Sequence, residues 1–335
     1  MQRLGRLPRS MRKSRITSLE WVRGIAILLV LFCHYGQSVG WEKSGIAGGV
    51  ANCIFFLLSG IVLGYTWRNT GGGKLGVDFL FRRFAKLYVP FILFLVPYSI
   101  ILAINDNIGI VDIILNFLML SWFRKLAGAG HLWFVTGISI LYLLIFAVSH
   151  LRKINTLSPT KGGGILIIIC ILMQYGLVKF GIKQAYFVML LVSGVITFLY
   201  GDIVMNTIVE LRNYKVLGVV ISILITVVLI LIKLEVKRVG YTLYYWICML
   251  VATFVVIICG IAIRANGVPR LVGWISAMSY ELYLVHYPFC MKSPLFVGQI
   301  MENRSAYAVC FLGVTTICAF LLKSSSNYIS CVIKK

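Results

Sequence analysis

The first long apolar run of the chain carries two ionisable side chains, Arg23 and His34, that lie eleven residues apart. Eleven residues are about three helical turns, so on a helix the two side chains point the same way, offset by about 20°. Glu20 lies three residues before Arg23 and joins the same face. Ionisable groups are costly in a membrane-spanning helix, and by default they mark a functional site that faces the protein interior.

His34 is the member of this stripe that is suited to proton chemistry. If the helix enters from the cytoplasm near residue 18, His34 lies roughly 20–25 Å along it, past the bilayer midplane, and Arg23 lies near the inner face. A neutral imidazole can accept a proton from a hydroxyl and pass it on. The alternative is a packed histidine that makes an interhelical hydrogen bond. Arg23 and Glu20 on the same face favour the chemical interpretation.

A basic cluster stands at the predicted cytoplasmic entry to the third apolar run. It consists of Arg82, Arg83 and Lys86. Such residues suit a polyanionic ligand, because arginine can bind phosphate oxygens bidentately. The alternative is ordinary anchoring of a helix end by positive charge.

Two later segments hold further candidates for substrate binding. His131 and Trp133 stand at the outer start of the fourth apolar run, where they could contact a substrate or belong to an interfacial aromatic belt. Ser279, Tyr283 and His286 fall on one face of another predicted helix. A second histidine on a polar stripe suggests the far wall of a hydrated cavity, and the alternative is a hydrogen-bonded packing stripe.

Several other classes of site are not indicated. The four histidines have no paired spacing and no carboxylate at ligand distance, so no metal site is predicted. The nine cysteines form no Cys-x-x-Cys pair and lie mostly within apolar runs, as small buried hydrophobes do. The net charge of +22 does not indicate nucleic-acid binding, because the basic residues cluster in short segments between apolar runs.

The composition requires that these residues be positioned by membrane helices. Apolar residues make up 60% of the chain and charged residues 13%, and the mean hydropathy is +0.95. A spanning helix needs roughly 20 mainly apolar residues. The sequence therefore predicts an all-α integral membrane protein with about ten transmembrane helices. We expect them at residues 18–39, 46–67, 84–104, 132–149, 164–180, 185–205, 216–232, 241–263, 274–291 and 305–323.

The distribution of lysine and arginine predicts the orientation. Placing both termini in the cytoplasm puts most of the basic residues inside. The apolar segment 110–122 is too short to cross, so a re-entrant or interfacial helix is expected there. We predict a basic cytoplasmic segment over 1–17, one transmembrane domain over 18–323 and a cytoplasmic tail over 324–335. The first apolar run is expected to be a retained helix rather than a cleaved signal peptide. We expect the protein in the plasma or inner membrane.

Five motifs in this order resemble the membrane acyltransferase family 3, whose members O-acylate cell-surface carbohydrates. The first apolar run carries Leu19-Glu20-Trp21-Val22-Arg23-Gly24 followed by His34, and the others are Phe55-Phe56-Leu57-Leu58-Ser59-Gly60, Arg83-Phe84-Ala85-Lys86-Leu87-Tyr88-Val89-Pro90, His131-Leu132-Trp133-Phe134 and Ser279-Tyr280-Glu281-Leu282-Tyr283-Leu284-Val285-His286. The resemblance extends from residue 18 to about residue 290.

The chain departs from the family pattern at a few positions. Glu20 stands where aspartate is usual, Lys86 replaces the second arginine of the third motif, and Val89 is inserted before Pro90. Lysine binds phosphate as a point charge rather than bidentately. The chain also leaves no room for the extracytoplasmic hydrolase-like domain of some relatives. We therefore expect it to complete the transfer alone or with a separate partner.

The resemblance implies an enzyme that uses acyl-CoA, with acetyl-CoA as the first expectation, and no tightly bound cofactor. The donor would bind from the cytoplasm at Arg82, Arg83 and Lys86. His34, with Glu20 and Arg23, would form the catalytic group. The acceptor would be a surface glycan or a lipid-linked sugar in contact with membrane lipids. It would be bound by residues of the last two motifs, namely His131, Trp133, Ser279, Tyr283 and His286.

Two other function classes remain open from the sequence. A proton-coupled transporter or flippase could use His34, His286 and Glu281 as a relay. Release of free CoA distinguishes an acyltransferase from a transporter, because a transporter would consume no thioester. An acyltransferase-like binding or sensor protein is a third interpretation, against which His34 and Arg23 argue. The sequence leaves a homo-oligomer open.

Overall fold

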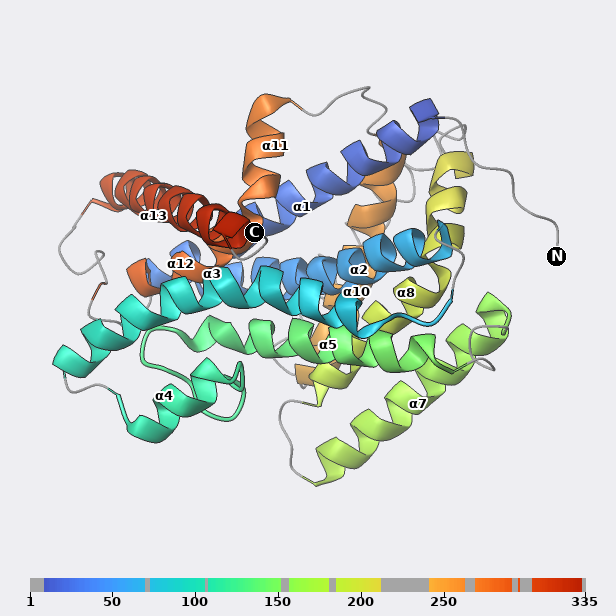
Figure 1. Ribbon diagram of the computed structural model, residues 1–335, viewed down its shortest axis with the longest axis horizontal. Coiled ribbons are helices and arrows are strands. Elements are labelled where there is room, and N and C mark those ends of the chain that lie inside the picture. Colours follow the sequence, from blue (N-terminus) through green and yellow to red (C-terminus); the bar gives the residue numbers. More distant parts are fainter. Residues whose placement is uncertain are drawn as a thin grey trace. The chain divides into compact units, whose positions relative to one another are not determined.

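The computed structural model describes residues 9–69, 73–105, 108–151, 157–180, 185–211, 241–262, 269–290, 295 and 303–332. Within these ranges the regular secondary structure is helical, with no strand, as the composition predicts. The elements are α1 (Arg9–Ser38), η1 (Glu42–Ser44), α2 (Gly45–Asn69), α3 (Val77–Ile104), α4 (Ile110–Phe117), η2 (Gly130–Leu132), α5 (Trp133–Ser149), α7 (Pro159–Lys179), α8 (Tyr186–Leu211), α10 (Tyr241–Ala262), α11 (Arg270–Ala277), α12 (Ser279–Val285), η4 (Tyr287–Phe289) and α13 (Arg304–Val332). Figure 1 shows their course along the chain.

Seven helices in the described part of the chain are long and apolar enough to cross a membrane. They lie at Ser18–Ser38, Glu42–Arg68, Val77–Ile104, Gly130–Ser149, Pro159–Lys179, Tyr186–Val204 and Arg304–Val332. Each corresponds to a predicted span. The apolar helix at Leu243–Cys259 is shorter, and the predicted span at 216–232 lies outside the described residues. The chain is a multi-pass membrane protein, whereas ten spans and the cytoplasmic position of both termini stay predictions.

The segment predicted as one helix over 274–291 is divided instead. α11 ends at Ala277, Met278 leaves the helical conformation with φ −100° and ψ 6°, and α12 follows. The 3₁₀ turn η4 then contains Pro288. Proline has no backbone N–H and its ring clashes with the carbonyl four residues earlier, which favours a break at Pro288, although α3 continues through Pro90 and Pro97. The prediction of an unbroken helix was wrong because hydropathy reports apolarity and not backbone geometry.

Helix ends also differ from the predicted spans. α3 begins at residue 77 rather than 84, and α13 continues to residue 332, through most of the segment expected as a tail. An apolar window marks the part of a helix that can lie in hydrocarbon. A helix can continue past that window into polar residues, as Asp78 shows in the first turn of α3.

The chain divides into two compact units. The first unit comprises Met1–Ala26, Gly49–Gly72 and Thr156–Ala277, and the second comprises Ile27–Gly48, Gly73–Asn155 and Met278–Lys335. In the first unit, α8 packs against α7 and α10. In the second unit, α13 packs against α12 and α3, and α3 also packs against α5.

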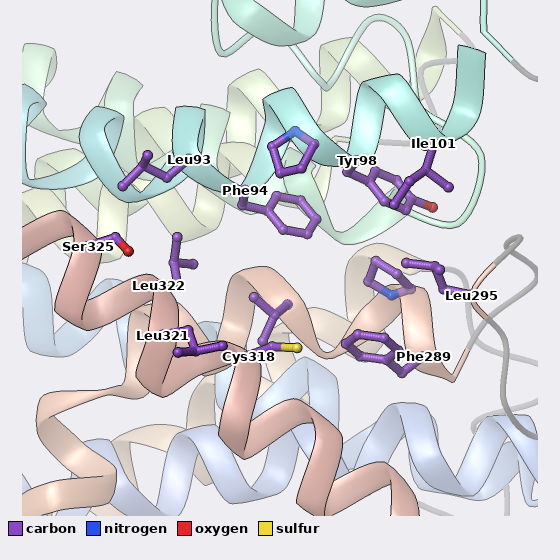
Figure 2. Close-up of a pocket in the computed structure, with 13 residues that line it drawn as sticks. Leu93, Phe94, Tyr98, Ile101, Phe289, Leu295, Cys318, Leu321, Leu322 and Ser325 are labelled. Atoms are coloured by element: carbon purple, nitrogen blue, oxygen red, sulfur yellow. The ribbon is translucent and has the colours of Figure 1, made fainter. Parts of the chain in front are cut away.

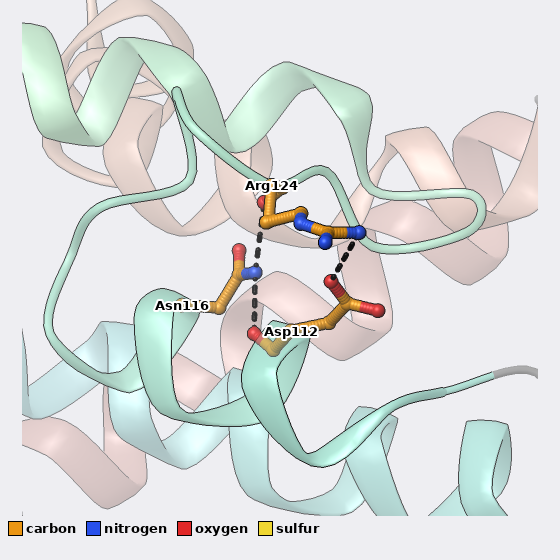
Figure 3. Close-up of polar contacts among 3 residues, drawn as sticks. All are labelled: Asp112, Asn116 and Arg124. Carbon is orange, nitrogen blue, oxygen red and sulfur yellow. Dashed lines mark hydrogen bonds and ion pairs between the residues drawn. The ribbon is translucent and has the colours of Figure 1, made fainter.

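The short helix expected within 110–122 is present as α4, of 8 residues. That is about 12 Å, well short of a bilayer core. Figure 3 shows how the segment after it is held: Asn116 Nδ2 donates to the backbone oxygens of Asp112, at 2.8 Å, and Arg124, at 3.0 Å. A guanidinium nitrogen of Arg124 lies 3.8 Å from a carboxylate oxygen of Asp112. These contacts fix the loop that leads into η2.

Candidate active site

Three of the four histidines meet in the second unit. His34 lies near the end of α1, His131 lies in η2, and His286 follows α12. The ring centroid of His286 is 5.1 Å from that of His34 and 5.1 Å from that of His131. Tyr287 is 4.7 Å from both His34 and His131, and Tyr283 is 5.2 Å from His131. We call these five residues the histidine cluster.

Pro288 accounts for the way His131 is held. Because proline has no N–H, it cannot donate to the carbonyl of Leu284, four residues earlier. Nε2 of His131 lies 3.0 Å from that carbonyl oxygen. A carbonyl only accepts, so Nε2 carries the proton in a neutral ring and Nδ1 carries the lone pair. Nδ1 is buried and has no hydrogen-bond partner among the described residues.

His286 is held in the opposite tautomer. Its Nδ1 lies 2.8 Å from the backbone oxygen of Tyr283 and 3.2 Å from that of Leu282. Nδ1 therefore donates, and Nε2 carries the lone pair. The residue is fully buried, and Nε2 has no partner in the described part of the chain. The cluster thus contains two buried imidazole lone pairs that no described group satisfies.

His34 is the partly buried member of the cluster. Its Nδ1 lies 3.1 Å from Oε1 of Gln37, one helical turn later in α1. An amide oxygen accepts, so Nδ1 carries the proton and the lone pair is on Nε2. A neutral imidazole with one nitrogen fixed as a donor presents the other as a base.

Two tyrosines complete the cluster. The hydroxyl of Tyr283 donates to the backbone oxygen of His131, which ties α12 to η2. The ring of Tyr287 stacks on that of His131, with 17° between their planes. Tyr287 and Gln37 are absent from the residues that the sequence singles out. Pro288 is the one signal that could have found Tyr287, because it predicts a break at which a side chain leaves the helix face.

The other predicted acceptor-binding residues lie in the same unit. Ser279 is buried at the start of α12, one helical turn before Tyr283. The ring of Trp133 packs edge-on against Trp122, at 6.1 Å between centroids, and also contacts Phe134. Trp133 therefore lies at the junction of α5 and the loop that precedes η2.

The predicted donor-binding residues stand near the start of α3. Arg82 and Lys86 are exposed, and the guanidinium of Arg83 lies 5.8 Å from the ring centroid of Phe79. Directly after Lys86, the backbone oxygen of Leu87 accepts from Tyr280 of α12, at 3.0 Å. Tyr280 precedes His286 by six residues, which is about 9 Å along a helix. The start of α3 and the histidine cluster therefore lie at opposite ends of α12.

Glu20 and Arg23 belong to the first unit, whereas His34 belongs to the second. Both side chains are partly buried. Their predicted place in the catalytic group with His34 stays a prediction. The partner observed for His34 is Gln37.

A buried ion pair adjoins the cluster along α12. The Nζ atom of Lys323 lies 2.9 Å from Oε1 of Glu281. Glu281 is 2% exposed, and its Oε2 has no hydrogen-bond partner among the described residues. The pair joins α12 to α13. Among the described residues, no group of three or more His, Cys, Asp or Glu side chains has the arrangement of a metal site.

Comparison with known proteins identifies the family. A family model for an acyltransferase domain, that of acyltransferase family 3, matches residues 16–323. No curated protein and no solved structure is significantly similar to the chain. The match covers nearly the whole chain and includes every motif that the sequence singles out. The chain therefore belongs to acyltransferase family 3.

Proposed function

We propose that the protein is a membrane O-acyltransferase that moves an acyl group from cytoplasmic acyl-CoA to a hydroxyl of a surface glycan or lipid-linked sugar. Membership of the family supports acyl transfer. The observation that carries the proposal is the histidine cluster. It holds three imidazole rings in contact, and each has one nitrogen bonded to an acceptor.

His34 is the base in this proposal. Of the three rings, it alone is not fully buried, so an acceptor hydroxyl can approach Nε2. Gln37 holds the tautomer in which Nε2 is unprotonated. General-base catalysis of this kind contributes typically 10²–10⁴-fold to a rate.

The reaction is a direct transfer. The acceptor oxygen forms an ester bond to the thioester carbonyl carbon while Nε2 of His34 takes the hydroxyl proton. The carbon–sulfur bond breaks, and CoA leaves as a thiolate. That thiolate takes up a proton, from the imidazolium or from water, and the imidazole returns to its neutral form.

The basic residues Arg82, Arg83 and Lys86 supply the donor site in this proposal. CoA carries several phosphate charges, and two of these side chains are exposed at the start of α3. The role of Glu20 and Arg23 in the catalytic group stays a prediction from the sequence. Acetyl-CoA is the first donor that the family resemblance leads us to expect.

The acceptor site in this proposal is built from His131, Trp133, Ser279, Tyr283 and His286. Because His131 and His286 are fully buried, a sugar hydroxyl would have to displace neighbouring side chains to donate to their unpaired lone pairs. A ligand that donates to both would remove the cost of leaving them buried and unpaired. We place the protein in the plasma or inner membrane, where such glycans are exported.

The test uses membranes of the cells that naturally make the protein, with and without it, supplied with acyl-CoA labelled in the acyl group. The proposal predicts base-labile label in glycan and one free CoA for each ester formed, in membranes with the protein only. Glycan translocation without CoA release would contradict the proposal and favour a transporter.

A further inference from the structure

An apolar pocket in the second unit lies between α3 and α13. Its volume is about 340 Å³, and it is open at its surface rather than enclosed. Leu93 and Phe94 line one wall and Leu321 and Leu322 the facing wall, as Figure 2 shows. The hydroxyl of Tyr98, one of the few polar groups in the lining, already donates to the backbone oxygen of Ala127, at 2.6 Å. The lining therefore suits hydrocarbon and not a sugar or a phosphate.

The pocket is long in the direction of α3. Its lining extends along that helix from Leu93 to Ile101, which is about 12 Å at 1.5 Å per residue. At roughly 30 Å³ for a group the size of a water molecule, its volume holds about ten methylene-sized groups. An acetyl group would leave most of this volume unfilled.

The pocket adjoins the histidine cluster. The ring of Phe94 lies edge-on to His131, with 6.4 Å between centroids. Val285 and Pro288 also line the pocket, and in the chain they flank His286 and Tyr287. The hydrocarbon chain of an acyl group begins at the carbonyl that reacts at the histidine cluster. The chain therefore starts within a few ångströms of the cluster. The tail of a lipid-linked acceptor is instead separated from the reacting hydroxyl by a sugar.

We propose that this pocket binds the hydrocarbon chain of the transferred acyl group, so that the preferred donor is a medium-chain acyl-CoA rather than acetyl-CoA. The inference rests on the proposed function and specifies its donor. Each methylene that enters the pocket adds about 0.8 kcal/mol of burial, or about fourfold in kcat/KM. The transferred group becomes the ester on the acceptor, and CoA leaves as before.

The first experiment compares acetyl-, butanoyl- and octanoyl-CoA as donors in membranes that contain the native glycan. The variant is Cys318→Phe, because Cys318 is a small residue in the wall of the pocket. The matched control is Ile317→Phe, the neighbouring residue on α13, which is 61% exposed and outside the lining. Protein levels are matched by immunoblot.

We expect wild-type kcat/KM to rise by about 10³-fold from acetyl to octanoyl, because six further methylenes are buried at about fourfold each. Cys318→Phe should lower the ratio of octanoyl to acetyl transfer by more than tenfold, whereas Ile317→Phe should keep the wild-type ratio. Acetyl transfer that exceeds octanoyl transfer, or an unchanged ratio in Cys318→Phe, overturns the inference and leaves the proposed function standing. No transfer from any donor overturns both.

A second experiment needs no variant. Wild-type protein in membranes is illuminated with an octanoyl-CoA that carries a diazirine at the end of its chain. We expect cross-links within residues 93–101 or 318–325, reduced more strongly by excess octanoyl-CoA than by the same excess of CoA. Cross-links elsewhere, or cross-links that octanoyl-CoA does not reduce, would show that the pocket holds ordinary bilayer lipid and would overturn the inference.

Discussion

A helix seam in the first unit and the histidine cluster of the second unit bury polar groups in different ways. In the first unit α2 meets α8 at a seam formed by Gly60, Gly64, Thr197 and Phe198. The hydroxyl of Thr197 has three backbone oxygens within reach there, at 2.9, 3.1 and 3.2 Å. The two glycines lie so close to the α8 backbone that neither leaves room for a Cβ atom. The seam is thus tightly packed, and its hydroxyl is satisfied.

The histidine cluster of the second unit shows the opposite arrangement. His131 and His286 each keep one buried ring nitrogen with no partner in the described part of the chain. An unsatisfied buried acceptor costs about 1–3 kcal/mol, and native proteins keep few of them. The polar groups of the seam are satisfied within the fold, whereas the unpaired nitrogens of the cluster agree with our proposal that it binds a ligand. Substitutions at the seam should therefore lower stability, and substitutions in the cluster should lower activity.

The largest effect on stability is expected from Gly64→Ala at the seam. A Cβ atom at residue 64 would overlap the backbone oxygen of Phe198, and backbone cannot give way as a side chain can. We expect a loss of about 3 kcal/mol in the free energy of unfolding, measured as a lower midpoint of thermal unfolding in detergent. Gly176→Ala is the control, because nothing lies within 4 Å of a Cβ atom there. A midpoint for Gly64→Ala equal to that of the control would contradict the packing of the seam.

A somewhat smaller effect is expected from Lys323→Met in the second unit, which leaves the Glu281 carboxylate buried without its cation. Breaking a fully buried pair costs about 3–5 kcal/mol. The side chain of Lys323 is 34% exposed, so we expect about 2 kcal/mol. The double variant with Glu281→Gln should recover most of the loss in thermal unfolding. A double variant no more stable than Lys323→Met would show that the charge of Glu281 is not the cause.

Thr197→Val at the seam should cost about 1 kcal/mol, because the hydroxyl loses its hydrogen bond while the shape of the side chain is kept. The measurement is thermal unfolding, together with acyl transfer corrected for the amount of folded protein. Transfer corrected in this way should equal that of the wild type. A fall in the corrected transfer would contradict the distinction between the seam and the cluster, since the seam would then take part in catalysis.

The smallest effect on stability is expected from Gly130→Ala beside the cluster. A Cβ atom at residue 130 would lie 3.3 Å from the hydroxyl oxygen of Tyr287, and this side-chain end can move by a few tenths of an ångström. We expect a stability change within about 0.5 kcal/mol and a fall in transfer of roughly three- to tenfold, because Tyr287 stacks on His131. Unchanged acyl transfer would show that the position of Tyr287 does not affect the reaction.

Most of the helices could be predicted because a membrane-spanning helix is recognised in a sequence as an apolar run of about 20 residues. The start of α3 and the end of α13 could not, since helices continue past the apolar window. The break at Met278 is defined by its φ and ψ angles, about which hydropathy contains no information.

The sequence could single out His34, His131 and His286, because an ionisable residue in an apolar segment is costly and by default marks a functional site. Their contact could not be predicted, because it depends on how three separate elements pack. Gln37 carries no signal in the sequence, and Tyr287 is marked only by the neighbouring Pro288. Both gain a role through the positions of His34 and His131.

The most direct test of the central claim is a single-turnover acyl transfer by the His34→Ala variant, with acyl-CoA binding measured on the same membranes. His150→Ala is the matched control, because His150 is exposed at the end of α5 and lies outside the cluster. If His34 is the base, His34→Ala binds acyl-CoA as the wild type does and transfers the acyl group 10²–10⁴-fold more slowly. The thermal midpoint stays near that of the wild type, and His150→Ala keeps full activity. A near wild-type transfer rate in folded His34→Ala protein would contradict the claim.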